Sequence, residues 1–229
     1  ERLQSIVNSS RGERIIHLAA LAHTEGEPDL SWDRYRHINV ECAKNVFEAA
    51  GDRPVLFIST IDVYGFNDGK KPVDGDSPIN PVSNYGKSKA MAEDECKKLR
   101  YFSIFRFSPV YTDEIKRDIQ KRYYLKYPNV AYQIGAGSEY EILNVKKAIK
   151  AMVDWCGVKP KNDVTIIKDE KTMWTPDYIK SEKENGRAKV VLRFPRWFIN
   201  CAYIVLKGIF GKNEKTYLLN KAVHPLRSE

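Results

Sequence analysis

The sequence is poor in cysteine and lacks several patterns that define a function at once. Its 229 residues include four cysteines, Cys42, Cys96, Cys156 and Cys201, which are widely spaced and form no Cys-x-x-Cys pair. This spacing favours reduced thiols in a cytoplasmic protein over a disulfide framework, and we expect no metal site. The chain also shows no signal peptide and no apolar run long enough to cross a bilayer.

Positive charge is in excess, with a formal net charge of +8. The lysines and arginines are spread along the chain, and no arginine-rich run alternates with aromatic residues as in proteins that bind single-stranded nucleic acid. We therefore expect a solvated basic surface and no nucleic-acid partner. A basic pocket for an anionic small molecule is the main alternative, and contact with nucleic acid or anionic lipid is the least favoured one.

The first half alternates between short apolar runs and segments with helical spacing. Strands are expected at 14–20, 54–58 and 102–107, and helices at 33–50 and 85–100. Such alternation predicts right-handed βαβ units and a parallel sheet, which bind ligands outside the carboxyl ends of their strands. Three expected strand ends define this edge: Ala19-Ala20, Ser59-Thr60 and Phe107-Ser108.

The second half changes character and predicts a different organisation. A charged helix is expected at 113–126, a short strand at 130–133, a plain turn at Gly135-Ala136-Gly137 and a helix at 145–155. The stretch 157–187 is polar, rich in lysine and typical of loops. We divide the chain into a core over 1–157, with 113–140 partly capping, and a capping lobe over 158–229.

The apolar segment 198–210 is interrupted by Asn200 and Lys207. It is too short and too polar to span a membrane. We expect a buried helix or a helix that contacts another subunit. Contact with a membrane surface, aided by the basic residues Arg193, Arg196 and Lys207, is the less favoured alternative.

The stretch from Ser59 to Lys89 carries the chemistry. Thr60 ends an apolar strand, and Tyr85 and Lys89 follow four residues apart on an expected helix, so their side chains share one face. A nearby ammonium stabilises a phenolate and lets the tyrosine act as a base well below its free pKa of about 10. The hydroxyl of Thr60 is placed to steady the substrate oxygen that loses its proton.

Further motifs occur in a characteristic order along the chain. They are His17-Leu18-Ala19-Ala20, Asn39-Val40, Ser59-Thr60 with Val63-Tyr64-Gly65, Tyr85-x-x-x-Lys89 with Glu93, Arg106 with Val110-Tyr111, and Gly135-x-Gly137-Ser138. Over about 15–151, and more loosely to Pro225, the chain resembles the extended short-chain dehydrogenase/reductases of the NAD-dependent epimerase/dehydratase branch. The resemblance implies an α/β fold, with a Rossmann-like parallel sheet flanked by helices and a small C-terminal α/β capping lobe.

The resemblance also implies roles for individual residues. Tyr85 is expected to be the catalytic base or acid, Lys89 its pKa-lowering partner and a ligand of the nicotinamide ribose, and Thr60 the catalytic hydroxyl. The residues expected to line NAD or NADP are Leu18, Ala19, Ala20, Asn39, Ser59, Tyr85 and Lys89. The implied reaction removes a proton from a sugar hydroxyl and a hydride from the adjacent carbon, and the keto intermediate is then reduced again on the other face, dehydrated or released. Family members often dimerise, here through helices 33–50 and 85–100.

The chain departs from the family at the cofactor's phosphates. A Gly-x-x-Gly-x-x-Gly turn at a helix N-terminus normally holds the pyrophosphate, but the early glycines here are only Gly12 and Gly26. We interpret the chain as lacking roughly the first quarter of its protein, and we expect it to bind NAD poorly and to be inactive alone. The choice between NAD and NADP is then invisible in this sequence.

The substrate motifs depart as well. Pro109 replaces a substrate-contacting asparagine, and Tyr140-Glu141 stand near the place of an arginine that grips the substrate diphosphate, for which Arg193 or Arg196 are candidate substitutes. Ile61-Asp62 replace the Asp-Glu of glucose-type dehydratases, which leaves Asp62 as a lone acid. We favour a sugar-nucleotide epimerase or a reductase over a dehydratase. A non-catalytic dinucleotide-binding relative and a membrane- or partner-associated scaffold are the alternatives.

Overall fold

The structure, a computed structural model, describes residues 5, 12–22, 31–67, 71–125 and 129–229. The chain forms two compact units that interleave along the sequence. The first unit comprises 1–65, 74–107 and 149–167, and the second comprises 66–73, 108–148 and 168–229. The sequence division at residue 157 assigned 163–167 to the capping lobe, whereas this strand pairs with the sheet of the first unit.

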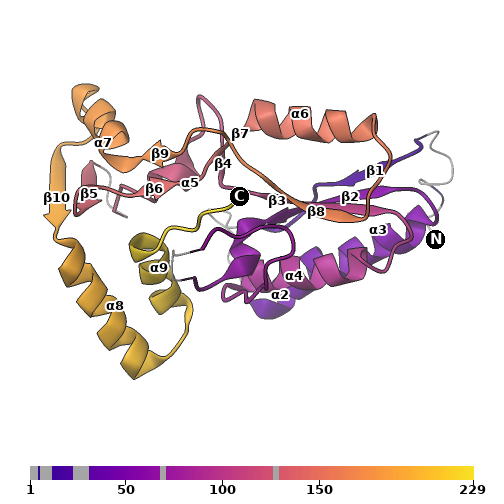
Figure 1. The fold of residues 1–229 in the computed structure, drawn as a ribbon, viewed down its shortest axis with the longest axis horizontal. Coiled ribbons are helices and arrows are strands. Elements are labelled where there is room, and N and C mark those ends of the chain that lie inside the picture. Colours follow the sequence, from indigo (N-terminus) through magenta and orange to yellow (C-terminus); the bar gives the residue numbers. More distant parts are fainter. Residues whose placement is uncertain (1–4, 6–11, 23–30, 68–70, 126–128) are drawn as a thin grey trace. The chain divides into compact units, whose positions relative to one another are not determined.

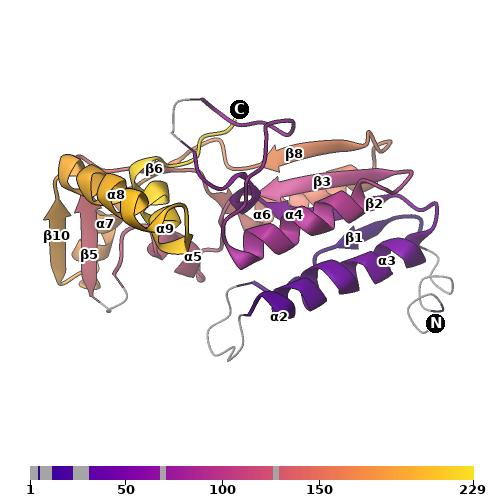
Figure 2. The ribbon, with the colours of Figure 1, turned by 90° about the horizontal axis from the view of Figure 1, so that it is seen from below.

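The first unit is built on a parallel sheet in the order β1-β2-β3-β8. Its strands are β1 (Ile15–His17), β2 (Val55–Thr60), β3 (Phe102–Phe107) and β8 (Asp163–Ile167). Helices α2 (Trp32–Arg36), α3 (Cys42–Ala50) and α4 (Asn84–Cys96) lie on one face of the sheet, and α6 (Val145–Cys156) lies on the other (Figures 1 and 2). This arrangement confirms the predicted parallel sheet flanked by helices.

One apolar core joins the sheet to its helices. Alternate residues of β2 and β3 point toward α3 and α4, because successive side chains of a strand face opposite sides. The buried cluster consists of Ala43, Phe47, Ala50, Val55, Phe57, Ala92, Cys96 and Ile104. Burial on this scale is the main force that fixes α4 against β2.

Several element boundaries in the first unit differ from expectation. The expected strand 14–20 stops at His17, and Leu18, Ala19 and Ala20 are exposed beyond the sheet. The expected helix 33–50 is interrupted by a π-helical turn over His37–Glu41 between α2 and α3. The helix expected over 85–100 ends at Cys96 and continues as a turn.

The second unit contains short strand pairs rather than one large sheet. β5 (Val130–Ile134) pairs in parallel with β10 (Val190–Phe194), β4 (Val110–Tyr111) in parallel with β7 (Leu143–Asn144), and β6 (Glu139–Tyr140) in antiparallel with β9 (Met173–Trp174). The helices are α5 (Arg117–Gln120), α7 (Thr175–Glu184), α8 (Arg196–Phe210) and α9 (Glu214–Val223). Its core comprises Ile119, Tyr123, Ala131, Tyr140, Ile142, Met173, Ile179 and Ala188.

Two expectations for the second half are wrong. The charged helix expected over 113–126 is only the four residues of α5, although Lys126 lies outside the described residues. The stretch 157–187, expected to be loop-like, contains β8, β9 and α7. Pro176 occupies the first turn of α7, where its missing N–H costs nothing. The predicted turn at Gly135–Gly137 is confirmed, with positive φ at both glycines.

The apolar segment 198–210 lies within α8 but is not buried. Trp197, Ile204 and Ile209 are each about two-thirds exposed, at 67%, 66% and 67%. Within the described part of the chain, no helix is both long and apolar enough to span a membrane.

Candidate active site

The carboxyl end of β2 carries the first candidate residues. Val55 to Ile58 are buried, and the chain then reaches Ser59, which is buried, and Thr60, which is half-buried. Thr60 Oγ1 accepts a hydrogen bond from the backbone N–H of Asp62 at 3.2 Å and so caps the 3-10 turn η2 (Ile61–Tyr64). This bond fixes the hydroxyl at the edge where parallel sheets bind ligands.

Helix α4 carries Tyr85 and Lys89 one turn apart. Its N-terminus is capped by Ser83, whose hydroxyl accepts from the N–H of Gly86 at 2.9 Å. Tyr85, in the first turn, is half-buried, and its ring centroid lies 6.4 Å from that of Tyr35. The predicted helical placement of Tyr85 and Lys89 is confirmed, and α4 packs on β2, the strand that ends with Thr60.

Lys89 is an unusually buried lysine, with 2% of its surface exposed. Its ammonium lies 4.0 Å from the centroid of the Phe57 ring on β2. Burial lowers the pKa of Lys89 to about 7, although the nearby Glu93 carboxylate acts in the opposite direction. A lysine whose pKa lies near neutral pH exchanges its proton readily, and a neighbouring anion shifts its protonation strongly.

The Phe57 ring also packs against His17, the last residue of β1. The two rings stack with centroids 5.8 Å apart, and His17 meets Phe47 edge-on at 5.7 Å. Burial first, and the charge of Lys89 second, lower the pKa of His17 to about 4. His17 is therefore neutral at physiological pH. The Phe57 ring packs against both His17 and the Lys89 ammonium.

Asn39 fastens the segment that follows the exposed residues Leu18–Ala20. Its carboxamide oxygen accepts from the N–H of Leu21 at 2.6 Å, and its amide nitrogen donates to the Leu21 carbonyl and to Ser88 Oγ, both at 2.9 Å. Ser88 in turn donates to the carbonyl of Tyr85 at 2.8 Å. Asn39 thus links the expected cofactor segment to the helix turn of Tyr85, and its direct contact with a cofactor stays a prediction.

A buried ionic network lies behind the strand ends. Glu93 accepts two hydrogen bonds from Arg106, at 3.1 and 2.7 Å, and a third from Ser59 at 2.5 Å. Arg106 also donates to the hydroxyl of Tyr64 at 2.8 Å, which in turn donates to the Asp74 carbonyl at 2.5 Å. Such a paired and fully bonded arrangement holds its members in one geometry. The network fixes Ser59, the neighbour of Thr60.

Glu93 and Arg106 belong to the motifs of the sequence, but no role was predicted for either residue. The available signal was an arginine inside the apolar run Phe102-Ser-Ile-Phe-Arg-Phe107, because a charge in a buried strand requires a partner. The network also explains the Val63-Tyr64-Gly65 motif. Tyr64 supplies the phenol, and Gly65 has φ 65° with a backbone so close to Asn80 that a Cβ would lie 1.7 Å from its carbonyl oxygen.

Asp62 is engaged at the start of α4. Its carboxylate accepts a hydrogen bond from the Ser83 hydroxyl, and it borders the small residue Gly86. A carboxylate beside a helix N-terminus is stabilised by the free N–H groups there. Asp62 thus has a structural task, which distinguishes it from a carboxylic acid kept available for a substrate.

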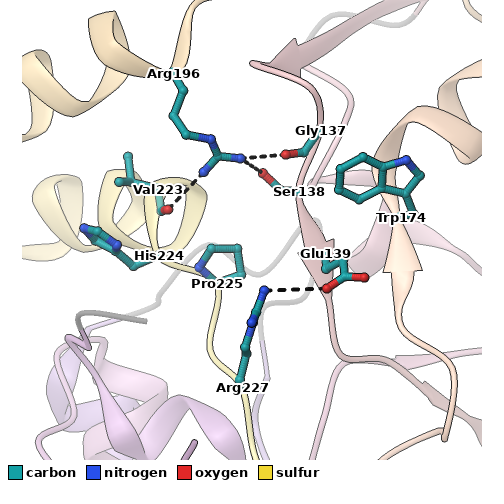
Figure 3. A pocket seen from close by; sticks show the side chains of 9 residues that line it. All are labelled: Gly137, Ser138, Glu139, Trp174, Arg196, Val223, His224, Pro225 and Arg227. Carbon is teal, nitrogen blue, oxygen red and sulfur yellow. Dashed lines mark hydrogen bonds and ion pairs between the residues drawn. The ribbon is translucent and has the colours of Figure 1, made fainter. Parts of the chain in front are cut away.

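A separate cavity of about 330 Å³ lies within the second unit (Figure 3). It is lined by Gly137, Ser138, Glu139, Trp174, Arg196, Val223, His224, Pro225 and Arg227. The Arg196 guanidinium donates to the carbonyls of Gly137 and Val223 and to Ser138 Oγ, at 2.6, 3.2 and 3.2 Å. Arg196 thus already donates to three protein acceptors and links the segment 137–138 to the end of α9. Arg227, opposite, forms an ion pair with Glu139 at 3.6 Å.

No cluster of metal-ligating side chains occurs among the residues that the structure describes. The candidate residues Thr60, Tyr85 and Lys89 offer a hydroxyl, a phenol and an ammonium group. The parallel sheet with helices on both faces defines an α/β protein of the Rossmann-like class.

The chain belongs to the NAD dependent epimerase/dehydratase family, which it matches over residues 1–159. It is 31% identical over 121 residues to putative UDP-arabinose 4-epimerase 4 of Arabidopsis thaliana, covering 47% of this chain and 27% of that protein. It is 32% identical over 94 residues to N-acetyl-alpha-D-glucosaminyl-diphospho-ditrans,octacis-undecaprenol 4-epimerase of Escherichia coli O157:H7, covering 40% of this chain and 27% of that protein.

A solved structure confirms the fold. UDP-glucuronic acid 4-epimerase from Bacillus cereus, in complex with NAD, superposes with a TM-score of 0.67 at 19% identity. The match covers 84% of this chain and 65% of that chain. The matched regions thus span about a quarter of the two curated relatives and about two-thirds of this structural neighbour.

Proposed function

We propose that the protein is an NAD(P)-dependent epimerase acting on a sugar nucleotide, with a simple reductase as the related alternative. The observation that carries this proposal is the pairing of Tyr85 with the buried Lys89 on α4, packed on the strand that ends in Thr60. The two curated relatives act, by their names, on sugars joined to a diphosphate. This shared feature supports the proposed substrate class.

In the proposed reaction Tyr85 accepts the proton of a sugar hydroxyl at its phenolic oxygen. Lys89 stabilises the phenolate, and its desolvated position makes this interaction strong, because little water screens it. Thr60 donates a hydrogen bond to the sugar oxygen while its proton leaves. NAD or NADP, when bound, supplies the acceptor that takes up a hydride and gives it back.

The described residues suit the nicotinamide half of such a cofactor. Leu18, Ala19 and Ala20 are exposed beyond β1, and the two alanines leave the backbone open to approach. Asn39 holds the following residue, Leu21, through both of its backbone groups. We assign the segment 18–20 to cofactor contact, with the Lys89 ammonium as the donor to a ribose hydroxyl.

Epimerisation is favoured over dehydration by the position of Asp62. A dehydratase needs an acid to protonate the departing hydroxyl, but the Asp62 carboxylate is bound by Ser83 at the start of α4. We expect substrate and product of equal mass that differ in the configuration at one carbon.

We also propose a cytoplasmic location and a homodimer formed through the helices at 33–50 and 85–100. The four cysteines are free, as in a reducing compartment. Met91 on α4 is 40% exposed, and Cys42 on α3 is exposed as well. A four-helix contact would cover both. Replacing Met91 by arginine should shift the protein to the monomer in light-scattering measurements, whereas an unchanged mass would contradict this interface.

The decisive experiment is Tyr85→Phe in the full-length protein, assayed with a panel of nucleotide sugars and either cofactor. We expect turnover to fall by roughly 10²–10⁴-fold because the proton acceptor is lost, whereas cofactor affinity changes little. Tyr101→Phe is the matched control, since it removes a phenol at the end of the same helix–strand unit and should leave turnover unchanged. Normal turnover of the Tyr85→Phe variant would overturn the proposal.

A further inference from the structure

Helix α8 presents a continuous apolar face that the described residues leave uncovered. Its exposed side chains are Trp197, Phe198, Cys201, Ile204, Val205 and Ile209. They recur at intervals of three and four residues and therefore share one side of the helix. No charged residue occupies this side, although it faces solvent.

The opposite side of α8 holds the helix to its unit. Tyr203 is buried, its hydroxyl accepts from Asn220 of α9 at 3.2 Å, and its ring meets that of His224 edge-on at 6.0 Å. The two helices lie side by side (Figures 1 and 2). The fold thus uses one side of α8 and leaves the apolar side available for another surface.

The chain segment that contains α8 carries basic residues and no acidic ones. Between 189 and 213 the chain has five basic residues and no acidic one: Lys189, Arg193, Arg196, Lys207 and Lys212. Arg196 is engaged inside the cavity, but Arg193 and Lys207 are exposed, and Lys207, three residues after Ile204 on the same helix, borders the apolar face. Long basic side chains at such a margin can reach headgroup phosphates while their stems cover apolar surface.

Helix α6 shows what an ordinary exposed helix of this chain is like. It also exposes apolar residues, Ile149 at 51% and Val153 at 63%. Charged residues directly follow both of them, however, and these two, Lys150 and Asp154, form an ion pair at 2.6 Å. The solvent side of α6 is therefore mixed in polarity, whereas that of α8 is uniformly apolar.

We propose that α8 docks in the plane of an anionic lipid bilayer surface, with its apolar face in the boundary between headgroups and acyl chains. Its fifteen residues span about 22 Å, too short to cross the roughly 30 Å of hydrocarbon. A lipid surface fits better than a second copy of the chain, because two copies would bring basic margins of like charge together. This inference goes beyond the proposed catalytic function and does not depend on it.

The test is sedimentation of the 229-residue chain with phosphatidylcholine vesicles that contain or lack phosphatidylglycerol. The chain should bind the anionic vesicles more tightly than the neutral ones, and the binding should weaken as salt increases. In the double variant Ile204→Glu with Ile209→Glu, the partition coefficient should fall by about a hundredfold, since burying each isoleucine accounts for about tenfold.

The matched control is Ile149→Glu with Val153→Glu on α6, which adds the same charge to another exposed helix. This control should keep most of the binding, and circular dichroism should show that both variants remain folded. Equal loss in both variants would show that net charge alone drives the binding and would overturn the docking of α8.

Trp197 provides a direct readout of insertion. Lipids with brominated acyl chains should quench its fluorescence on binding, and the Trp197→Phe variant should bind with that quenching lost. No binding of the original chain to anionic vesicles would overturn the proposal. So would a dimer in solution that the Ile204→Glu and Ile209→Glu variant abolishes while vesicle binding is absent, because the face would then belong to a second copy.

Discussion

Buried charges in the first unit lie at the strand ends, whereas those in the second unit fasten chain segments. In the first unit Lys89, Glu93 and Arg106 are each at most 2% exposed and lie on α4 and β3, beside the carboxyl edge of the sheet. In the second unit Glu141 is bound by Lys168 at 3.0 Å and by the backbone and side chain of Ser228 at 2.7 and 2.8 Å. Its task is to hold the segment near residue 228.

The hydrogen-bond partners of a buried charged side chain help to distinguish a structural role from a functional one. Glu93 and Glu141 both have complete sets of partners, as buried carboxylates require. Lys89 is the contrast, because its pKa is lowered to about 7 mainly by burial. Because burying an ammonium is costly, we interpret Lys89 as a residue retained for the proposed chemistry.

The largest effect is expected for Glu93→Gln. It leaves the buried Arg106 guanidinium without a compensating charge and should lower the free energy of unfolding by about 3–5 kcal/mol. Urea unfolding followed by circular dichroism measures this loss. Glu95→Gln, on the same helix and with the exposed Lys98 as its ion-pair partner, should cost less than about 1 kcal/mol. Equal midpoints for the two variants would contradict the structural role of the network.

The Lys89→Met substitution should change the free energy of unfolding in the opposite direction. Removing the desolvated ammonium should raise the free energy of unfolding by about 1–4 kcal/mol, while it abolishes turnover of the full-length protein. Lys87→Met, an exposed lysine of the same helix, should change neither quantity appreciably. A destabilised Lys89→Met variant would show that the ammonium is a structural charge like those of the second unit.

The pH dependence of stability sharpens this prediction. The folded pKa of Lys89 is about 7 and lies below its ordinary value of 10.5, so the unfolded chain holds the proton over a range where the folded chain has released it. The stability of the original chain should therefore gain a contribution as pH rises from about 7 to about 10.5. That contribution should be missing in Lys89→Met, and parallel pH profiles for the two chains would contradict the lowered pKa.

The Glu141→Gln substitution tests whether the buried carboxylate of the second unit holds the segment near residue 228. Loss of the charge-assisted bonds to Lys168 and Ser228 should lower the free energy of unfolding by about 2 kcal/mol and expose the segment near residue 228 to proteases. The matched variant is Glu139→Gln, whose exposed ion pair with Arg227 is 3.6 Å long and should contribute under about 1 kcal/mol. Similar proteolysis of both variants would show that Glu141 is not the fastening.

The smallest effect is expected for Ile204→Glu. An exposed side chain on the apolar face of α8 supports no packing, so the free energy of unfolding should change by less than about 0.5 kcal/mol. Thermal unfolding without lipid measures this. A loss of several kcal/mol would mean that the face is packed within the protein.

Much of the first unit was predictable from sequence because its signals are local. The run over 102–107 is mostly apolar and is followed by Ser108-Pro109, and its strand is confirmed at the predicted bounds. The spacing of Tyr85 and Lys89 also requires only one helix turn. β8, by contrast, was overlooked because Asp163–Ile167 is short and flanked by lysines, and only its pairing with β3 defines it as a strand.

The parts of the site that escaped prediction depend on tertiary contacts. Glu93 and Arg106 are separated by thirteen residues and meet only when β3 lies beside α4. The burial of Lys89 likewise depends on the Phe57 ring, which comes from a strand far earlier in the chain. The helix expected over 113–126 was wrong in its extent: Ile119 and Tyr123 do pack into the core of the second unit, but the regular helix is confined to α5 and the chain continues as a turn over 121–123.

The interleaving of the two units has a consequence for how such a protein can change. The chain passes from one unit to the other after residues 65, 73, 107, 148 and 167. A single recombination junction in the gene therefore cannot exchange one unit for that of a relative, since no single cut separates all residues of one unit from all residues of the other. Chimeras must transplant several segments at once, and we expect the two units to have been inherited together.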